Sequence, residues 1–143
     1  MTIAAILKHK GNEVARVTPT ATIAEVAQRL RSRRIGAVLV LDSADQLLGI
    51  VSERDIVSSL AEHGAETLRM TAAQLMTRDL FTTTPQTSVA EAMAQMTQRR
   101  VRHLPVLEDA RLVGLVSIGD VVKARIDSQE QEVDSLKAYV TGA

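Results

Sequence analysis

The chain has 143 residues, the length of one ordinary domain or two very small ones, and 45% of them are hydrophobic, enough for a buried core. Basic and acidic residues balance at 17 each, so no net charge draws the protein to nucleic acid or to a membrane surface. The absence of cysteine excludes disulfides and thiolate metal sites, and one Phe and one Tyr cannot stack single-stranded nucleic acid. No apolar run approaches the roughly 20 residues of a membrane-spanning helix, and no signal peptide is evident. We therefore expect a cytoplasmic protein.

The first half of the chain predicts an alternation of helices and strands. Ile23, Val26 and Leu30 recur at helical spacing, whereas the continuous apolar run 37–41 is typical of a strand covered on both faces. The turn after this run and a second apolar run predict a β-hairpin. The expected elements are a helix over 2–8, an extended piece over 14–17, a helix over about 23–33, strands over 37–41 and 47–51, and a helix after Ser52 that Gly64 ends.

The second half repeats this order in register. Thr84-Pro85 matches Thr18-Pro19, and Val89, Ala92, Met93 and Met96 match the helical positions Ile23, Val26, Ala27 and Leu30 at the same spacing. A unit of about 60 residues buries too little surface to be more than marginally stable alone. We therefore expect one α/β module over 1–143, with repeat 1 at about 2–65 and repeat 2 at about 70–127, each β-α-β-β-α and packed face to face with pseudo-twofold symmetry.

Each repeat ends in the same motif, Gly-x-x-Ser-x-x-Asp. It comprises Gly49, Ser52 and Asp55 in the first copy and Gly114, Ser117 and Asp120 in the second. A Ser with an acidic residue three positions later predicts a capped helix start. The same junction offers N–H groups and a partial positive charge to an anion. A cap alone and a ligand site are both open at this point.

The last helix continues past the point where its counterpart in the first repeat stops. Its apolar positions are spaced alternately by four and three residues, as in a coiled-coil seam, and Gly142 lies just past its expected end. This extension, at about 128–141, either packs on its own module or meets another subunit. The seam consists of Val122, Ile126, Gln129, Val133, Leu136 and Val140.

These features together resemble the cystathionine-β-synthase (CBS) domain family. The resemblance rests on the repeat, the Thr-Pro pairs, the run from His103 to Val106 and the two Ser-x-x-Asp motifs, and it covers about residues 2–127. The chain is similar to a stand-alone pair of CBS domains, a Bateman module, and its string from Ser52 to Ile56 is similar to CBS pairs of inosine-monophosphate dehydrogenases. No catalytic barrel accompanies it here.

The resemblance implies two clefts between the repeats, each binding an adenosyl ligand such as AMP, ADP, ATP, NAD or S-adenosylmethionine. In such proteins the motif Asp accepts hydrogen bonds from ribose hydroxyls, and the motif Ser lies near the ribose and phosphates. Carried over, one cleft would comprise Ser117, Ile118 and Asp120 with Thr18, Thr22, Ile35, Gly36 and Ala37, and Arg102 and His103 could reach its phosphates. The other would comprise Ile50, Ser52, Arg54 and Asp55 with Thr84, Ser88 and Val101, and Arg102 or His103 could reach this cleft too.

The residue types suit such a ligand. A carboxylate supplies the acceptors that a ribose diol needs, and aliphatic side chains would form the adenine slot. The clefts should be unequal, because Arg102-His103 stands where the first repeat has Gly36-Ala37. Glu53 beside a triphosphate would be unfavourable, which favours a short phosphate chain or a dinucleotide in that cleft. Among the adenosyl ligands, AMP is the one we expect first.

Three functions follow as hypotheses. The first is a regulatory adenine-nucleotide sensor that forms a homodimer and acts on an effector protein the sequence does not identify. The second is a protein-interaction module whose clefts are empty or vestigial. The third, a phosphohydrolase using Ser117, His103 and Asp120, is disfavoured because Ser and Asp share one helical turn and no nucleophile elbow is present. We expect neither a catalytic site nor a metal site, since the three His residues have no ligand spacing.

Overall fold

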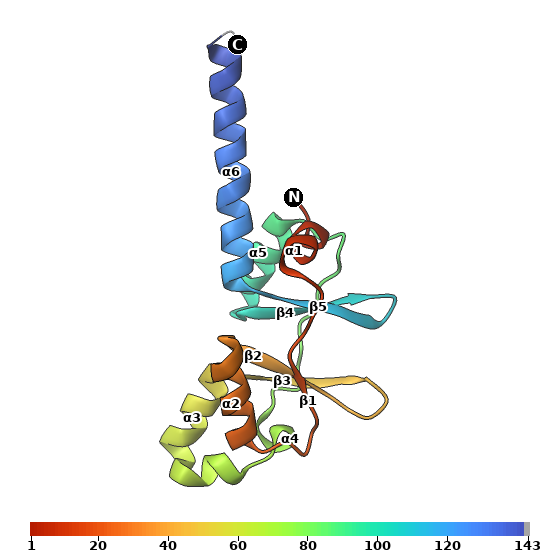
Figure 1. The fold of residues 1–143 in the computed structure, drawn as a ribbon, viewed down its shortest axis with the longest axis vertical. Coiled ribbons are helices and arrows are strands. Elements are labelled where there is room, and N and C mark those ends of the chain that lie inside the picture. The colour runs from red at the N-terminus through yellow and green to blue at the C-terminus, as the bar shows by residue number, and fades with distance from the viewer. Residues whose placement is uncertain (142–143) are drawn as a thin grey trace. The chain divides into compact units, whose positions relative to one another are not determined.

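The computed structural model describes residues 1–141, and they form two compact units. Unit 1 consists of Met1–Asn12 together with the chain from Phe81 onward, and unit 2 is Glu13–Leu80. The fold is mixed α/β, as predicted, and the two units repeat one architecture (Figure 1). The predicted Gly142 lies outside the described residues.

Unit 2 is a three-stranded sheet with helices packed on it. The strand order is β1-β2-β3, with β1 parallel and β3 antiparallel to the central strand. All five residues of β2 are buried, in line with its continuous apolar run. The elements are β1 (Arg16–Val17), α2 (Ile23–Arg33), β2 (Ala37–Leu41), β3 (Leu47–Ser52), α3 (Glu53–His63), the 3₁₀ helix η1 (Gly64–Arg69) and α4 (Ala72–Leu75).

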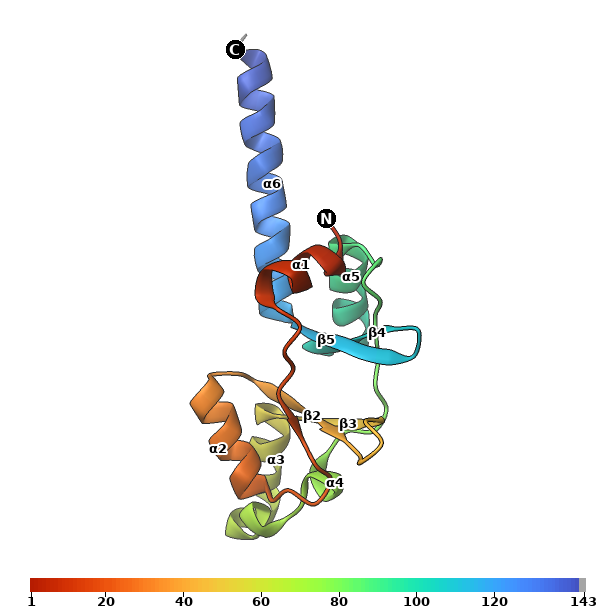
Figure 2. The ribbon, with the colours of Figure 1, turned by 45° about the vertical axis from the view of Figure 1, so that its right-hand side comes forward.

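The core of unit 2 follows the predicted helical face. Ile23, Val26 and Leu30 of α2 are buried against strand residues such as Val38 and Val51. These side chains recur once per helical turn, so they form one apolar stripe facing the sheet. Figure 2 shows α2 and α3 side by side on that sheet.

Unit 1 is built around the hairpin of β4 and β5. Strand-like pairing of Thr83 with Val106 takes the position that β1 has in unit 2. The helices α1, α5 and α6 pack beside this hairpin (Figures 1 and 2). The elements are α1 (Ile3–Lys10), α5 (Val89–Arg99), β4 (His103–Glu108), β5 (Arg111–Ser117) and α6 (Ile118–Val140).

The compact units do not follow the boundaries of the sequence repeats. In the predicted repeats, each leading helix belongs to the repeat that follows it along the chain. In the structure α1 packs in unit 1, with the strands of the second repeat, and α4 packs in unit 2, with those of the first. The 3₁₀ helix η1 was also not predicted; its buried Thr67 pairs with Ser59 of α3 at 2.8 Å between the hydroxyl oxygens.

The motif glycines explain where the leading helices pack. A Cβ at Gly49 would stand 2.7 Å from both Met76 Sδ and Thr77 O, and one at Gly114 would stand 2.6 Å from Leu7 Cδ2. Real Cβ atoms do not approach that closely. Each glycine therefore lets a neighbouring segment lie directly on the second strand of the hairpin.

Candidate functional site

Each unit places its Ser-x-x-Asp motif where the second strand of the hairpin turns into a helix. In unit 2 the Ser52 side chain accepts a hydrogen bond from Asp55 N, and Asp55 Oδ2 accepts from Ser52 N at 2.8 Å and from Ser52 Oγ at 2.9 Å. This reciprocal arrangement is a capping box, and it confirms the predicted helix start. Asp thus fills the position where Glu or Gln is preferred.

Unit 1 repeats the capping box at Ser117 and Asp120. Asp120 N donates to Ser117 Oγ at 3.1 Å, and Ser117 N donates to Asp120 Oδ2 at 2.9 Å. In both units the backbone N–H of the motif Ser bonds to the carboxylate through Oδ2. A carboxylate can accept several hydrogen bonds, so serving as a cap does not use its full capacity as an acceptor.

The motif of unit 1 also bonds to a lysine side chain. Lys10, the last residue of α1, donates from Nζ to Asp120 Oδ2 at 2.6 Å and to the carbonyl oxygen of Leu115 at 2.9 Å. Partial burial by itself raises the pKa of the Asp120 carboxyl. The hydrogen bonds from Lys10 and Ser117 and the charge of Lys10 outweigh that effect, so its pKa lies below the ordinary value of 3.8.

In unit 2, the carbonyl oxygen that corresponds to that of Leu115 accepts a hydrogen bond from a backbone N–H group. Ile50, which stands where unit 1 has Leu115, pairs through its backbone with Thr77: Thr77 N donates to Ile50 O at 2.9 Å. Within unit 2, Asp55 bonds to Ser52. In unit 1, Asp120 bonds to Ser117 and also to the ammonium group of Lys10.

At the two helix starts, fewer N–H groups remain to bind an anion than the sequence predicted. Glu53 N already donates to Gly36 O at 2.9 Å, and Ile118 N donates to Arg102 O at 2.8 Å. The N–H of the third helical residue is used by the motif Ser in each capping box. In the first turn this leaves the N–H of the second helical residue, Arg54 or Gly119, to face a phosphate.

The predicted strand residues lie beside the motif of their own unit. Ala37 pairs with Ser52 across the hairpin of unit 2, and His103 pairs with Ser117 across that of unit 1. Gly36 and Arg102 precede these strand residues. Their carbonyl oxygens accept hydrogen bonds from the N–H of the first helical residue of each motif. Each unit therefore brings its motif together with the start of its own central strand.

The predicted hydroxyl residues ahead of the helices have local partners. Thr22 caps α2 by accepting from Glu25 N at 3.2 Å, and Ser88 caps α5 by accepting from Glu91 N at 3.0 Å. Thr18 Oγ1 lies 3.3 Å from Thr20 Oγ1, and Thr84 Oγ1 lies 2.9 Å from Thr87 Oγ1. These contacts order the loops whether or not a ligand is bound.

The predicted aliphatic and basic residues divide between the units. Ile35 and Val101 are half-buried against the core of their own unit, Ile50 is half-buried in β3, and Ile118 is exposed. Arg54 and Arg102 are exposed and His103 is half-buried. Each predicted cleft combines residues of both units, and this combination stays a prediction.

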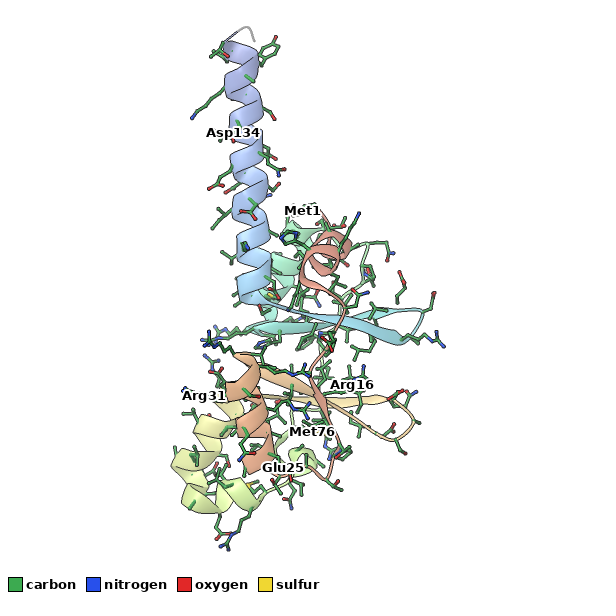
Figure 3. The ribbon with its side chains drawn as sticks, in the orientation of Figure 1. Met1, Arg16, Glu25, Arg31, Met76 and Asp134 are labelled. Carbon is green, nitrogen blue, oxygen red and sulfur yellow. The ribbon has the colours of Figure 1, made fainter. Side chains whose placement is uncertain are left out.

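Two of the grooves within the units border predicted site residues. One of about 920 Å³ runs between α2 and α3 and is lined by Ile35 and Glu53, among others. The other, of about 390 Å³, runs between α1 and α6, with Lys10 and Asp120 on its wall. Figure 3 shows the side chains around both, with Arg31 of the first groove and Met1 of the second labelled.

Thr83 is a buried polar residue that was not among the predicted site residues. This residue is 5% exposed, and its Oγ1 has no hydrogen-bond partner among residues 1–141. The equivalent position in unit 2 holds Val17, whose pairing with Val40 corresponds to that of Thr83 with Val106. The only indication in the sequence was that the second repeat has Thr83 where the first repeat has Val17.

No group of three or more His, Cys, Asp or Glu side chains within residues 1–141 could hold a metal ion. In that part of the chain, no helix is long and apolar enough to cross a membrane.

Comparison with known proteins identifies the family. The family model of the CBS domain matches residues 10–62 and 72–127, so the chain belongs to the CBS domain family and carries a pair of these domains. It is 34% identical to the mitochondrial CBS domain-containing protein CBSX3 of Arabidopsis thaliana, over 99% of this chain and 72% of that protein. It spans only 22% of the longer CBS domain-containing protein CBSCBSPB1 of the same plant.

Solved structures share the fold. The CBS-domain containing protein ATU1752 from Agrobacterium tumefaciens is 40% identical, with a TM-score of 0.84 over 87% of this chain and 92% of that one. The CBS domain pair of protein MJ0100, solved in complex with 5′-methylthioadenosine and S-adenosyl-L-methionine, is 23% identical, with a TM-score of 0.79 over 90% of this chain and 98% of that one. At that identity the second likeness concerns the fold alone.

Proposed function

We propose that this protein is a non-catalytic regulatory module that binds an adenosyl ligand, with AMP the first candidate. The observation that carries the proposal is the pair of Ser-capped aspartates, Asp55 and Asp120, at matching strand–helix junctions. A carboxylate can accept more hydrogen bonds than its cap requires, and a ribose diol needs such an acceptor. The MJ0100 pair supports the choice of ligand class, because its ligands also contain a ribose and an adenine.

In this proposal the ligand's ribose bonds to the motif Asp. Its phosphate, where present, meets the N–H of Arg54 or Gly119 and the side chains of Arg102 and His103. A single free helical N–H and few cations favour a short phosphate chain over a triphosphate. The clefts that combine both units, the homodimer and the cytoplasmic location remain part of the proposal, as does an effector protein.

A thermal-melting screen tests the proposal. Nucleotide-free protein is melted with AMP, ADP, ATP, NAD or S-adenosylmethionine, one at a time. A ligand present at about 100 times its Kd adds about 2.7 kcal/mol to the free energy of unfolding, which raises Tm by several degrees in a chain of this size. We expect a selective rise with one or two compounds. No rise with any of them at millimolar concentration would overturn the nucleotide proposal.

The second candidate is an interaction module without a ligand. The observation that favours it is the helix α6, whose side chains are all exposed from residue 129 to residue 141. A ligand site at the aspartates and an interaction surface on this part of α6 can occur in one protein, since they are different surfaces. A melting screen without shifts, combined with a stable oligomer, would leave the second candidate alone.

A further inference from the structure

The C-terminal half of α6 buries no side chain in its own unit, within the described residues. The last side chains of the helix that are buried are Val121 and Ala124, near its start, and every residue from 129 to 141 is exposed. Figures 1 and 2 show this half extending beyond α1 and α5, and in Figure 3 its side chains, Asp134 among them, stand clear of the rest of unit 1. A bare helix of about 12 residues is marginal in water, so this segment needs a partner to be stable.

One face of this helix is apolar although it is exposed. Val133, Leu136 and Val140 are 50%, 63% and 74% exposed, and Val122 and Ile126 continue the same stripe towards the start of the helix. Their alternating spacing of four and three residues puts them at the a and d positions of a heptad repeat. Gln129 occupies the middle d position, where a polar side chain restricts register and oligomeric state at some cost in stability.

The charges beside the stripe decide which partner fits. The g positions hold Arg125 and Glu132, and the e positions hold Lys123, Glu130 and Lys137. In a parallel pair each g side chain faces the e side chain five residues further along the other helix. Arg125 then meets the partner's Glu130, and Glu132 meets the partner's Lys137, so all these contacts join opposite charges.

An antiparallel pair of the same helices would oppose like charges. When Ile126 is set against the partner's Leu136, Glu132 faces the partner's Glu132 and Glu130 faces the partner's Glu130. Lys123 then faces the partner's Lys137. Like charges at these flanks are a common device for excluding an alternative pairing.

We propose that α6 pairs with α6 of a second copy of this chain as a parallel two-stranded coiled coil over residues 122–140. The apolar stripe supplies the contact, and the flanking charges select a parallel homodimer. The proposal is independent of the nucleotide, because it uses none of the residues of the capping boxes. It also sets the geometry of the dimer that the sequence left open.

Disulfide trapping tests the orientation. The chain has no cysteine, so each introduced thiol is the only one present. In a parallel coil the two copies of Val140→Cys lie side by side at an a position, and we expect a cross-linked dimer on mild oxidation. Ala138→Cys, on the outer face of the same helix turn, is the matched control and should remain mostly monomeric on a denaturing gel. Equal trapping of both variants, or of neither, would overturn the proposal.

A mixing experiment detects the antiparallel alternative. A Val122→Cys variant that carries a cleavable tag is mixed with an untagged Val140→Cys variant, and the mixture is oxidised. The tag lets a gel separate the mixed dimer from the two homodimers by size. The parallel coil gives only the two homodimers. A prominent mixed dimer would show the antiparallel pairing and contradict the proposal.

Charge reversal gives a second, independent readout. Lys137→Glu sets two glutamates against each other in the parallel coil, so the dimer measured by sedimentation should weaken at least tenfold. Mixing it with Glu132→Lys restores opposite charges in a heterodimer, which should form in preference to either homodimer. In the antiparallel arrangement Lys137→Glu would instead meet Lys123 and strengthen the dimer, a result that would overturn the proposal.

Discussion

Lys10 Nζ lies 2.6 Å from Asp120 Oδ2, and this bond joins two residues 110 positions apart in the chain. The lysine ends α1 and the aspartate belongs to the first turn of α6, so the bond ties the leading helix of the chain to its last one. The equivalent Asp55 bonds to Ser52 in the capping box of unit 2.

The first prediction concerns the stability that this bond contributes. Lys10→Met should lower the free energy of unfolding at neutral pH by about 1 kcal/mol, because the pair is partly exposed and screened by solvent. The folded-state pKa of Asp120 is depressed, so this stability is complete above 3.8, the ordinary value, and is lost as pH falls through the folded-state pKa. The difference in Tm between wild type and Lys10→Met should therefore shrink in acid.

Lys8→Met is the control for that series. Lys8 is exposed on the same helix, and its ammonium group forms no ion pair within residues 1–141. Its removal should leave Tm unchanged at every pH. A Lys10→Met difference that stayed constant into strong acid would show that packing of the lysine stem, and not its charge, is what matters.

The second prediction compares the two aspartates as ligand acceptors. Lys10 competes with a ribose for the Asp120 carboxylate, so Asp55→Ala should reduce the melting shift caused by a ligand more than Asp120→Ala does. In a Lys10→Met background the two substitutions should become more nearly equal. Calorimetric titration of the four variants gives the comparison.

Asp→Asn variants separate binding from capping. An asparagine keeps a carbonyl oxygen for the motif Ser N–H, so Asp120→Asn should preserve the cap and still weaken binding. Loss of an N-cap alone costs about 1 kcal/mol. If Asp120→Ala binds normally but melts much lower, the motif of unit 1 is only a cap.

The third prediction concerns the buried hydroxyl of Thr83. Thr83→Val should raise the free energy of unfolding by about 1 kcal/mol, since it removes a polar group without a partner and keeps the side-chain shape. The repeat supplies a precedent, because Val17 holds the equivalent place. Denaturant unfolding measures the change, and a destabilised variant would mean that Oγ1 has a partner in solution.

The fourth prediction uses the two motif glycines as a matched pair. A methyl group at Gly49 meets the backbone oxygen of Thr77, which cannot move without shifting a strand pairing, whereas one at Gly114 meets only the end of the Leu7 side chain. Gly49→Ala should therefore cost about 1 to 3 kcal/mol, and Gly114→Ala distinctly less. Equal losses in denaturant unfolding would contradict this account.

Local pattern was sufficient to predict most of the elements. The stripe of Ile23, Val26 and Leu30 defined α2, the continuous apolar run defined β2, and the Ser-x-x-Asp spacing defined two helix starts that the structure confirms. These signals work because each depends on residues within a few positions of one another. Repetition in register then predicted the second unit from the first.

What sequence reasoning missed depends on contacts between distant segments. Nothing near Lys10 indicates that it bonds to Asp120, and nothing near Thr83 indicates that its hydroxyl is buried without a partner. The helices α1 and α4 were expected in the repeats that follow them, since a pattern does not show which strand a helix packs on. The glycines at 49 and 114 mark the close approaches, but a glycine does not name the segment that approaches it.

The packing of α1 in unit 1 has a consequence for synthesis on the ribosome. Unit 2 is one continuous stretch, Glu13–Leu80, and can form as soon as that stretch has emerged. The segment Met1–Asn12 emerges before unit 2 but completes a core that includes Leu104, Val116 and Val121. Ile3 and Leu7 therefore stay without these partners until Val121 has been translated, and a chaperone that binds short apolar helices has that interval in which to act.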